Sequence, residues 1–263
     1  MPQYSPVEWL ALCTNENKLQ ISLRRHIHHI EDYIVKIDLA ADELDAYGDV
    51  NDPRVTGLMS ENAKAATELV MKNTSIPVPV FIEDGYIGGS GTRRYFSVWE
   101  YIDGLSLETE WKGLSTDTKE RIMGQLHGYA LQLKGISNPF NDRFAVGTLC
   151  STHELLNDPN IPGRQRAFWS NNGPFTTVEE FKEKVDILYG REPTFSANTP
   201  SVFDHMDWFM CNVLIDHSRE NVIGVLDWEK AGFIPDPEGS FLAGADESVK
   251  ARLYLWLTLF DSR

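Results

Sequence analysis

Two polar stretches near the end of the sequence bring together residue types that can handle phosphate groups and a divalent cation. Residues 202–216 hold Asp207 and Asn212 ahead of an apolar run, and residues 222–229 end a second apolar run at Asp227. A carboxylate can accept the proton of an attacking hydroxyl group, and carboxylate and amide oxygens can hold Mg²⁺ against phosphates. These residue types at this spacing suit phosphoryl transfer.

Two short strands must position these side chains. The apolar runs predict strands at residues 212–216 and 221–226, joined by a turn. A hairpin of this kind would bring Asn212 beside Asp227, with Asp207 in the preceding loop. The alternative is a capped turn without chemistry, because Asp and Asn favour turns through local hydrogen bonds.

A lysine from the first half of the chain could complete the site. Lys36 lies within the β-rich run of residues 33–37, and its ammonium group could neutralise phosphates. The alternative is a solvated lysine on an edge strand. Nearby, His26, His28 and His29 could suggest a metal site, but no cysteine or carboxylate cluster joins them, so we favour a partly exposed strand or turn.

The second half of the pattern resembles a known family. The residues that carry the resemblance are His205-x-Asp207-x₄-Asn212-(apolar)₃-Asp216, then Asp227-Trp228-Glu229-x-Ala231-Gly232. They look like the aminoglycoside phosphotransferase-like (phosphotransferase enzyme) family, in the style of its fungal members. That family is itself similar to protein kinases and choline kinases. Residues 74–79 and 99–107 also resemble that family, and the match covers roughly Lys36 to Gly232.

The resemblance implies an α+β, bilobal protein-kinase-like fold. Residues 1–101 would form a small, strand-rich nucleotide-binding N-lobe. Residues 102–263 would form a larger, mainly helical C-lobe that carries the catalytic and substrate-binding groups. The two lobes would make one kinase-like unit with an interlobe link at residues 101–104.

The resemblance also assigns roles in the C-lobe. It implies Asp207 as the catalytic base and Asn212 and Asp227 as the Mg²⁺ ligands. It implies that His205 is structural and braces the catalytic loop.

For the nucleotide, the resemblance implies ATP as the cosubstrate. Lys36 would contact its phosphates, and the backbone of Glu100, Tyr101 and Ile102 would receive the adenine.

The sequence departs from the family pattern in three features. No glycine precedes Gly48, so the glycine-rich loop that commonly covers ATP phosphates is missing ahead of Lys36. The helix glutamate that should pair with this lysine is not evident, because its spacing points to Ala63, between Glu61 and Glu68. In the catalytic loop, Met206 and Trp208 replace the usual glycine and leucine.

The remaining elements follow from periodicity and from turn residues. We predict a short helix within residues 5–19 and an extended region at 19–37. A surface loop is expected at 38–58 and a glycine-rich hairpin loop at 85–92. Further helices are predicted at 59–73, 115–136, 178–189 and 247–260. Residues 76–82 are predicted to begin one further strand, and residues 95–102 to form another.

Composition limits the classes of partner. The 263 residues carry a formal net charge of −15, which disfavours nucleic acid and suits cationic ligands or metal ions better. The favoured alternative is that the negative surface only keeps a cytoplasmic protein soluble. The sequence lacks an apolar run long enough to span a membrane and a signal peptide, so we expect a cytoplasmic protein, either a monomer or a homodimer. Cys13, Cys150 and Cys211 are expected to be reduced and mostly buried.

Three functions fit these observations. The favoured one is an ATP-dependent kinase acting on a hydroxyl group of a small molecule. A degenerate kinase fold that binds a nucleotide or partner, and a scaffold adapted to other small-molecule chemistry, remain open. The acceptor pocket could be lined by five aromatic residues, although such residues more often belong to the core: Trp169, Phe175, Tyr189, Trp228 and Trp256.

Overall fold

A computed structural model of the chain describes residues 4–21, 25–39, 53–88, 93–138, 147–149 and 201–235. The helices predicted at 178–189 and 247–260 lie outside these residues. The same holds for Cys150 and for four of the five aromatic residues considered for the acceptor pocket, Trp228 being the exception.

The first half of the chain is built on a five-stranded antiparallel sheet with the order β1-β2-β3-β5-β4. Its strands are β1 (Lys18–Ile21), β2 (Arg25–Ile30), β3 (Tyr33–Asp38), β4 (Phe81–Ile87) and β5 (Arg94–Glu100). Successive side chains of a strand face opposite sides, so Val35 and Ile37 enter a core on one face while Lys36 faces the other. The extended region predicted at residues 19–37 is confirmed for its described residues, which form β1, β2 and β3.

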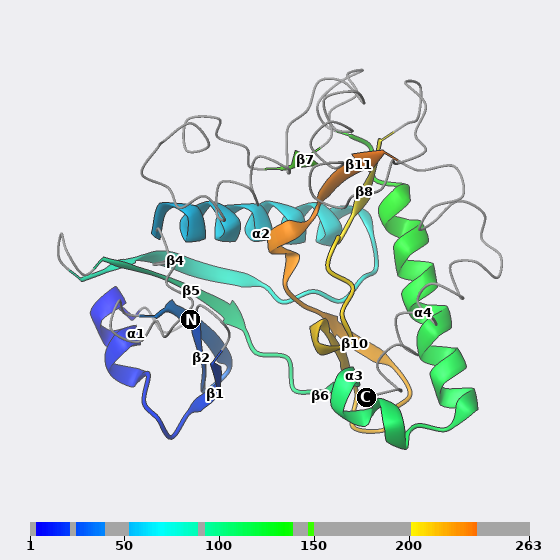
Figure 1. Cartoon of the computed structure of the whole chain (residues 1–263), viewed down its shortest axis with the longest axis horizontal. Coiled ribbons are helices and arrows are strands. Elements are labelled where there is room, and N and C mark those ends of the chain that lie inside the picture. The colour runs from blue at the N-terminus through cyan, green and yellow to red at the C-terminus, as the bar shows by residue number, and fades with distance from the viewer. Residues whose placement is uncertain are drawn as a thin grey trace, which may run out of the picture.

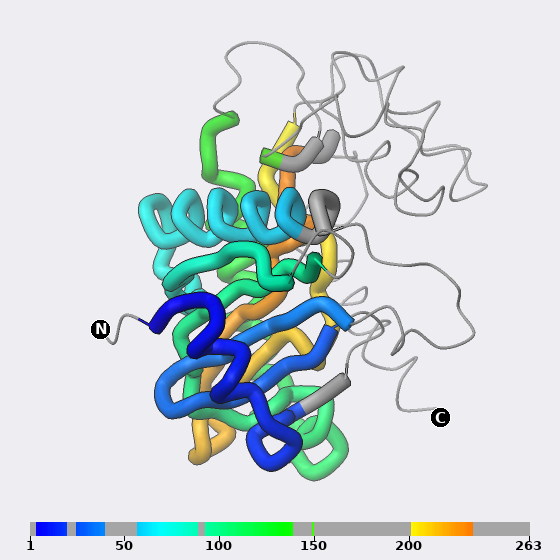
Figure 2. The backbone as a smooth tube through the Cα atoms, turned by 90° about the vertical axis from the view of Figure 1, so that its left-hand side faces the viewer, coloured from blue at the N-terminus to red at the C-terminus, as the bar shows by residue number. Residues whose placement is uncertain are grey.

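Two helices cover the two faces of this sheet. Helix α1 (Pro6–Leu12) begins with a capping box between Ser5 and Glu8, and its Trp9 is buried against one face. Helix α2 (Pro53–Asn73) packs on the other face, against β4 and β5. Figure 1 shows α2 above these strands and α1 below them, and Figure 2 shows α1 in front of the sheet.

The prediction of a loop through residue 58 is wrong at its end, because α2 already begins at Pro53. Proline fits the first turn of a helix, where its missing N–H is not needed. Gly57 is a packing residue within this helix: a Cβ atom there would lie 2.7 Å from the Tyr86 hydroxyl oxygen. The glycine lets α2 approach the sheet closely.

The predicted hairpin loop at 85–92 also begins too early. Strand β4 continues through Gly85, Tyr86 and Ile87, paired with β5. A Cβ atom on Gly85 would lie 3.0 Å from the Phe96 ring on β5. Here glycine makes room for an aromatic ring on the neighbouring strand rather than marking a turn.

The second half begins after the link at residues 101–104. The boundary proposed between the two lobes, at residues 101 and 102, lies within this link. Its helices are α3 (Leu107–Glu110) and α4 (Thr116–Lys134), with 3₁₀ turns η1 (Trp111–Gly113), η2 (Met210–Asn212) and η3 (Trp228–Lys230). Ser115 caps α4 at its start, and Gly135 is its C-cap residue, as predicted for 115–136.

Two small sheets accompany these helices. One has the order β10-β9-β6 and the other β7-β11-β8. Their strands are β6 (Leu105–Ser106), β7 (Gly147–Thr148), β8 (Ser201–Asp204), β9 (Val213–Ile215), β10 (Val222–Val225) and β11 (Gly232–Pro235). The strand pair predicted at 212–216 and 221–226 is confirmed as β9 and β10, which are antiparallel.

One apolar core joins the two halves of the described chain. It contains Ala66 and Val70 of α2 and Trp99 of β5, together with Ile122 of α4 and Phe233 of β11. No helix in the described residues is long and apolar enough to cross a membrane.

Two expectations about exposure need correction. His26 and His28 lie on β2, as expected for a strand, but both side chains are buried. Cys211 is exposed rather than buried, because it lies at the surface of the η2 turn, while Cys13 is partly buried. Within the described parts of the chain, no cluster of three or more His, Cys, Asp or Glu residues is arranged to hold a metal ion.

Candidate active site

A buried histidine braces the loop between β8 and β9. The His205 side chain has no exposed surface, and its Nε2 lies 2.8 Å from the Leu226 carbonyl oxygen. Its Nδ1 lies 3.1 Å from the Asp207 backbone nitrogen, which donates to it. A carbonyl only accepts and a backbone N–H only donates, so the proton must sit on Nε2. Burial lowers the pKa of His205 to about 4, so the ring is neutral at pH 7.

The next residue, Met206, has the left-handed backbone conformation, with φ of 61°. This conformation favours glycine, because a Cβ atom is strained there. The glycine common at this position of the family pattern therefore has a geometric reason, and this chain keeps the same turn with a methionine.

The turn presents Asp207 to a lysine from the following segment. The Lys230 Nζ donates to Asp207 Oδ1 at 2.9 Å, and the carboxylate is mostly buried. Burial raises the pKa of Asp207 above its usual value, although the Lys230 hydrogen bond and charge oppose this effect. Lys230 was not predicted from the sequence, because the family pattern leaves its position unspecified.

The β9–β10 hairpin brings Asn212 beside the segment that carries Asp227. Val213 pairs with Val225, and the Leu226 N–H donates to the Asn212 carbonyl oxygen at 2.7 Å. The Asn212 side-chain nitrogen donates to the Asp207 carbonyl oxygen at 2.9 Å, which ties the amide to the loop between β8 and β9.

Strand β3 directs Lys36 to this same place. Its Nζ lies 3.4 Å from Asp227 Oδ1 and 3.9 Å from Glu229 Oε1, and its side chain is 21% exposed. Burial raises the pKa of Asp227, but the charges of Lys36 and Arg25 outweigh it and hold that pKa below its usual value. Lys36 is therefore directed inward, unlike a solvated lysine at a sheet edge.

The lysine's second carboxylate partner comes from the segment after β10. Glu61 and Glu68 of α2 are exposed, whereas Glu229 is buried and forms ion pairs with both Lys36 and Arg25. Arg25 on β2 also reaches Asp38, at 3.5 Å. Sequence reasoning missed Arg25, which lies 204 residues from Glu229 in the chain.

Helix α2 contributes an asparagine in place of a glutamate. The Asn62 side chain is fully buried, and its nitrogen donates to the carbonyl oxygens of Glu229 at 3.0 Å and Ala231 at 2.9 Å. Its oxygen accepts from the Leu149 N–H at 2.7 Å. Asn62 thus fixes the backbone that follows Asp227, and it lies next to Ala63, the position indicated by spacing.

Two of the three backbone amides expected to receive the adenine, those of Glu100, Tyr101 and Ile102, already donate hydrogen bonds within the protein. The Glu100 N–H donates to the Val80 carbonyl oxygen and the Tyr101 N–H to that of Asp32, both at 2.8 Å. The Tyr101 ring stacks on His29 with 3.8 Å between ring centroids. Adenine recognition by this link would then rely on its carbonyl groups and on the Ile102 amide.

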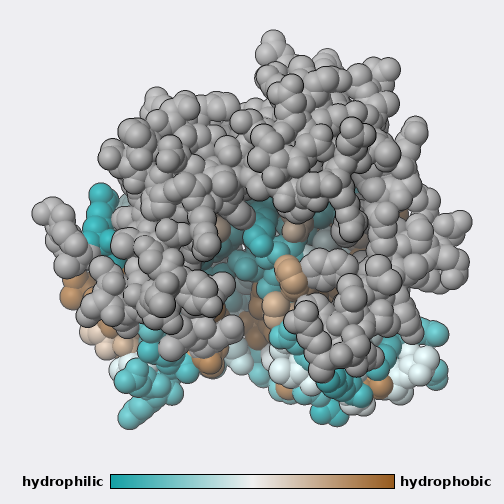
Figure 3. Space-filling view, in the orientation of Figure 1, coloured by the Kyte–Doolittle hydropathy of each residue, from teal (hydrophilic) through white to brown (hydrophobic). Residues whose placement is uncertain are grey.

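Hydrophilic and hydrophobic residues lie side by side at the centre of the view in Figure 3, between the parts that carry α1 and α3. Trp228 does not contribute to such a surface, because it is 1% exposed and its indole donates to the Val225 carbonyl oxygen.

Comparison with known proteins identifies the family. The model of the phosphotransferase enzyme family matches residues 26–235, which include every residue of the site described above except Arg25. The chain belongs to the phosphotransferase enzyme family. A search of curated proteins finds no significant match.

Solved structures of similar fold are aminoglycoside phosphotransferases. The GDP and kanamycin complex of APH(2")-IIia aligns with a TM-score of 0.52 and 14% identity, over 91% of this chain and 75% of that chain. A GDP complex of an aminoglycoside 2'-phosphotransferase-IIIa mutant aligns with a TM-score of 0.51 and 15% identity, over 86% and 68% of the two chains. At this identity the likeness establishes the bilobal, kinase-like α+β fold of this phosphotransferase-family chain.

Proposed function

We propose that the protein transfers the γ-phosphoryl group of ATP to a hydroxyl group of a small molecule. The observation that carries this proposal is the cluster of Lys36, Asp207, Asn212 and Asp227 contributed by β3, the catalytic loop and the β9–β10 hairpin. A cation for phosphates, a carboxylate for a hydroxyl proton and oxygen donors for a metal are the groups that phosphoryl transfer uses.

Asp207 would act as the base. The acceptor oxygen attacks the γ-phosphorus, the bond from that phosphorus to the bridging oxygen of ADP breaks, and the hydroxyl proton passes to Asp207. One carboxylate oxygen is held by Lys230, and the other would accept the hydroxyl proton. Burial raises the pKa of Asp207, which makes it a stronger proton acceptor.

Asn212 and Asp227 would hold Mg²⁺, which would neutralise the phosphate oxygens when bound. The donor set fits, because the Asn212 nitrogen is turned to the Asp207 carbonyl and the Asp227 side chain is 37% exposed and ionised. Two protein oxygens do not hold Mg²⁺ alone. They match the usual mode in which one or two side chains bind the ion together with phosphates and water.

Lys36 would contact the phosphates of ATP, with Glu229 and Arg25 fixing its position. In this arrangement residues 1–101 supply the nucleotide contacts and residues 102–263 supply the base, the metal ligands and the acceptor site. The net charge of −15 favours a cationic acceptor. A structure of similar fold holds kanamycin, so cationic, hydroxyl-rich compounds are the first acceptors to screen. We place this activity in the cytoplasm.

Nucleotide turnover tests the proposal. We expect slow, Mg²⁺-dependent hydrolysis of ATP without acceptor, and a loss of about 100-fold or more in Asp207→Asn, since a positioned base contributes roughly 10²–10⁴-fold. Asp103→Asn is the matched control, because Asp103 is exposed and pairs only with exposed His217 among the described residues. GTP is assayed in parallel, since structures of similar fold hold GDP.

Binding must be measured beside turnover. Mg²⁺ and ATP should raise the melting temperature of both the native chain and Asp207→Asn, because a ligand of the folded state stabilises it. Binding without turnover, even across a panel of cationic acceptors, would favour the nucleotide-binding alternative. Equal turnover in the native chain and Asp207→Asn would remove Asp207 from the mechanism.

A further inference from the structure

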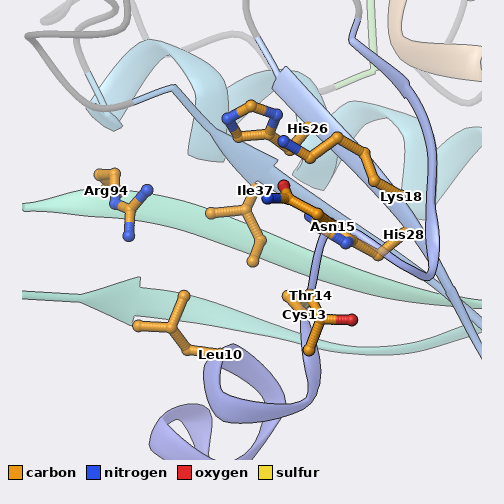
Figure 4. Close-up of a pocket in the computed structure, with 9 residues that line it drawn as sticks. All are labelled: Leu10, Cys13, Thr14, Asn15, Lys18, His26, His28, Ile37 and Arg94. Carbon is orange, nitrogen blue, oxygen red and sulfur yellow. The ribbon is translucent and has the colours of Figure 1, made fainter.

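A cavity of about 360 Å³ opens on the face of the five-stranded sheet that α1 covers (Figure 4). Its volume lies within the range of roughly 300–1,000 Å³ common for small-molecule sites. The lining comes from α1, from the segment after it and from strands β1, β2, β3 and β5. Its residues are Leu10, Cys13, Thr14, Asn15, Lys18, His26, His28, Ile37 and Arg94.

This cavity is separate from the candidate active site, although the two share strands. Ile37 lines the cavity, whereas its neighbour Lys36 reaches Asp227 on the other face of β3. On β2, His26 lines the cavity, whereas its neighbour Arg25 reaches Glu229. Alternation along each strand places the two sites on opposite faces of one sheet.

The charge of the lining is opposite to that of the whole chain. Acidic residues outnumber basic ones by 39 to 24 in the sequence, yet the nine lining residues include Lys18, Arg94 and two histidines and no carboxylate. Within the described residues, no carboxylate pairs with Lys18. Figure 4 shows Lys18 extending toward His26, with Ile37 between this pair and Arg94.

Burial is the main cause of the pKa shifts of two titrating groups in the lining. Burial lowers the pKa of His28, and the charges of His26 and Lys18 lower it further. Burial raises the pKa of Cys13 to about 11, so its thiol stays neutral at pH 7 and does not oppose an anion. His28 is held in place by Asn17, whose side-chain oxygen lies 3.0 Å from Nδ1.

We propose that this cavity binds a small phosphate-bearing metabolite. Guanidinium, ammonium and imidazole groups are the side chains that proteins use for phosphate, and charge-assisted hydrogen bonds to them are strong. The Thr14 hydroxyl and the Asn15 amide at the exposed edge of the cavity add neutral donors. The site is a feature of the sheet itself and does not depend on the function proposed for the other face.

Histidine NMR with inorganic phosphate as the probe tests this site, with ionic strength held constant by sodium chloride. We expect saturable shifts of the His26 and His28 ring signals. We expect no saturable shift for His217, which is exposed on the other half of the chain. Arg94→Gln should weaken phosphate binding about tenfold or more, since hydrogen bonds to charged groups are among the strong ones.

Two comparisons make the result specific. Arg93→Gln removes the same charge one residue away, from an exposed side chain that stacks on Tyr86, and should leave the affinity unchanged. Lys36→Met removes a cation from the opposite face and should also leave it unchanged. If Arg94→Gln does not fold, Lys18→Gln replaces it, with exposed Lys72→Gln as its control.

Three results would overturn the proposal. The first is that the His26 and His28 ring shifts do not saturate with phosphate. The second is that the cavity variant and its matched control weaken phosphate binding equally. The third is that the His26 and His28 shifts are lost in Lys36→Met. The last result would assign the phosphate to the nucleotide site.

Discussion

Replacing His205 should change how the stability of the protein depends on pH. In the folded chain the buried ring is neutral, with a pKa of about 4, whereas an unfolded histidine has a pKa of about 6.5. As pH falls below 6.5, the unfolded chain takes up a proton that the folded chain does not. The folded state therefore loses stability through this one residue as the solution is acidified.

The magnitude follows from the two pKa values. Between pH 8 and pH 5, the difference in proton binding at His205 corresponds to about 2 kcal/mol of lost stability. His205→Gln has no titrating ring, so its free energy of unfolding should fall by about 2 kcal/mol less than that of the native chain over the same interval. At pH 8 the variant should itself be less stable, because Leu226 and Asp207 lose their buried hydrogen-bond partner.

Urea unfolding at pH 8 and pH 5 measures both quantities. His217→Gln is the control, because His217 is 63% exposed and pairs with an exposed carboxylate; it should keep the pH dependence of the native chain. If the variant lacking His205 does not fold, NMR of the native chain decides the question, since the His205 ring should not titrate between pH 8 and pH 5. An identical pH dependence with and without His205, or a His205 ring that titrates near pH 6.5, would refute the inference that this buried ring stays neutral in the folded chain.

Two further substitutions test the backbone around the site. Met206→Gly should keep the free energy of unfolding or raise it by up to about 1 kcal/mol, because glycine adopts the left-handed conformation without strain. Met71→Gly, at an exposed position of α2, should lower it by about 1 kcal/mol. Equal losses of stability in thermal unfolding of the two variants would contradict this. Asn62→Leu should cost about 3 kcal/mol by leaving three buried backbone groups unpaired, and should slow turnover. Exposed Asn73→Leu should cost under about 1 kcal/mol, and similar losses in the two variants would exclude a role for Asn62 in fixing the Asp227 segment.

Local patterns were sufficient for much of the fold. The strands β9 and β10 follow from two apolar runs separated by a turn, and α4 follows from its period, its serine cap and its terminal glycine. Both signals act over a few residues, so they can be read along the chain. Glycines misled the same reasoning at two positions. The missing side chain makes room for Tyr86 of β4 at Gly57 in α2, and for the Phe96 ring of β5 at Gly85.

The amino-acid sequence by itself determined which residues could do the chemistry. Asp207, Asn212 and Asp227 stand at fixed short spacings that one hairpin must bring together, and the family match includes them. Lys36 could be named from its strand and from the resemblance.

Only the tertiary structure decided which groups hold those residues in place. Glu229 pairs with Lys36 and Arg25, Asn62 of α2 holds the segment after Asp227, and Lys230 holds Asp207. Arg25 and Asn62 lie 204 and 167 residues from Glu229, and Lys36 lies 191 residues from Asp227. No local pattern encodes such contacts, because they arise when strands and helices distant in the chain bury their polar side chains against one another and each buried group must find a partner.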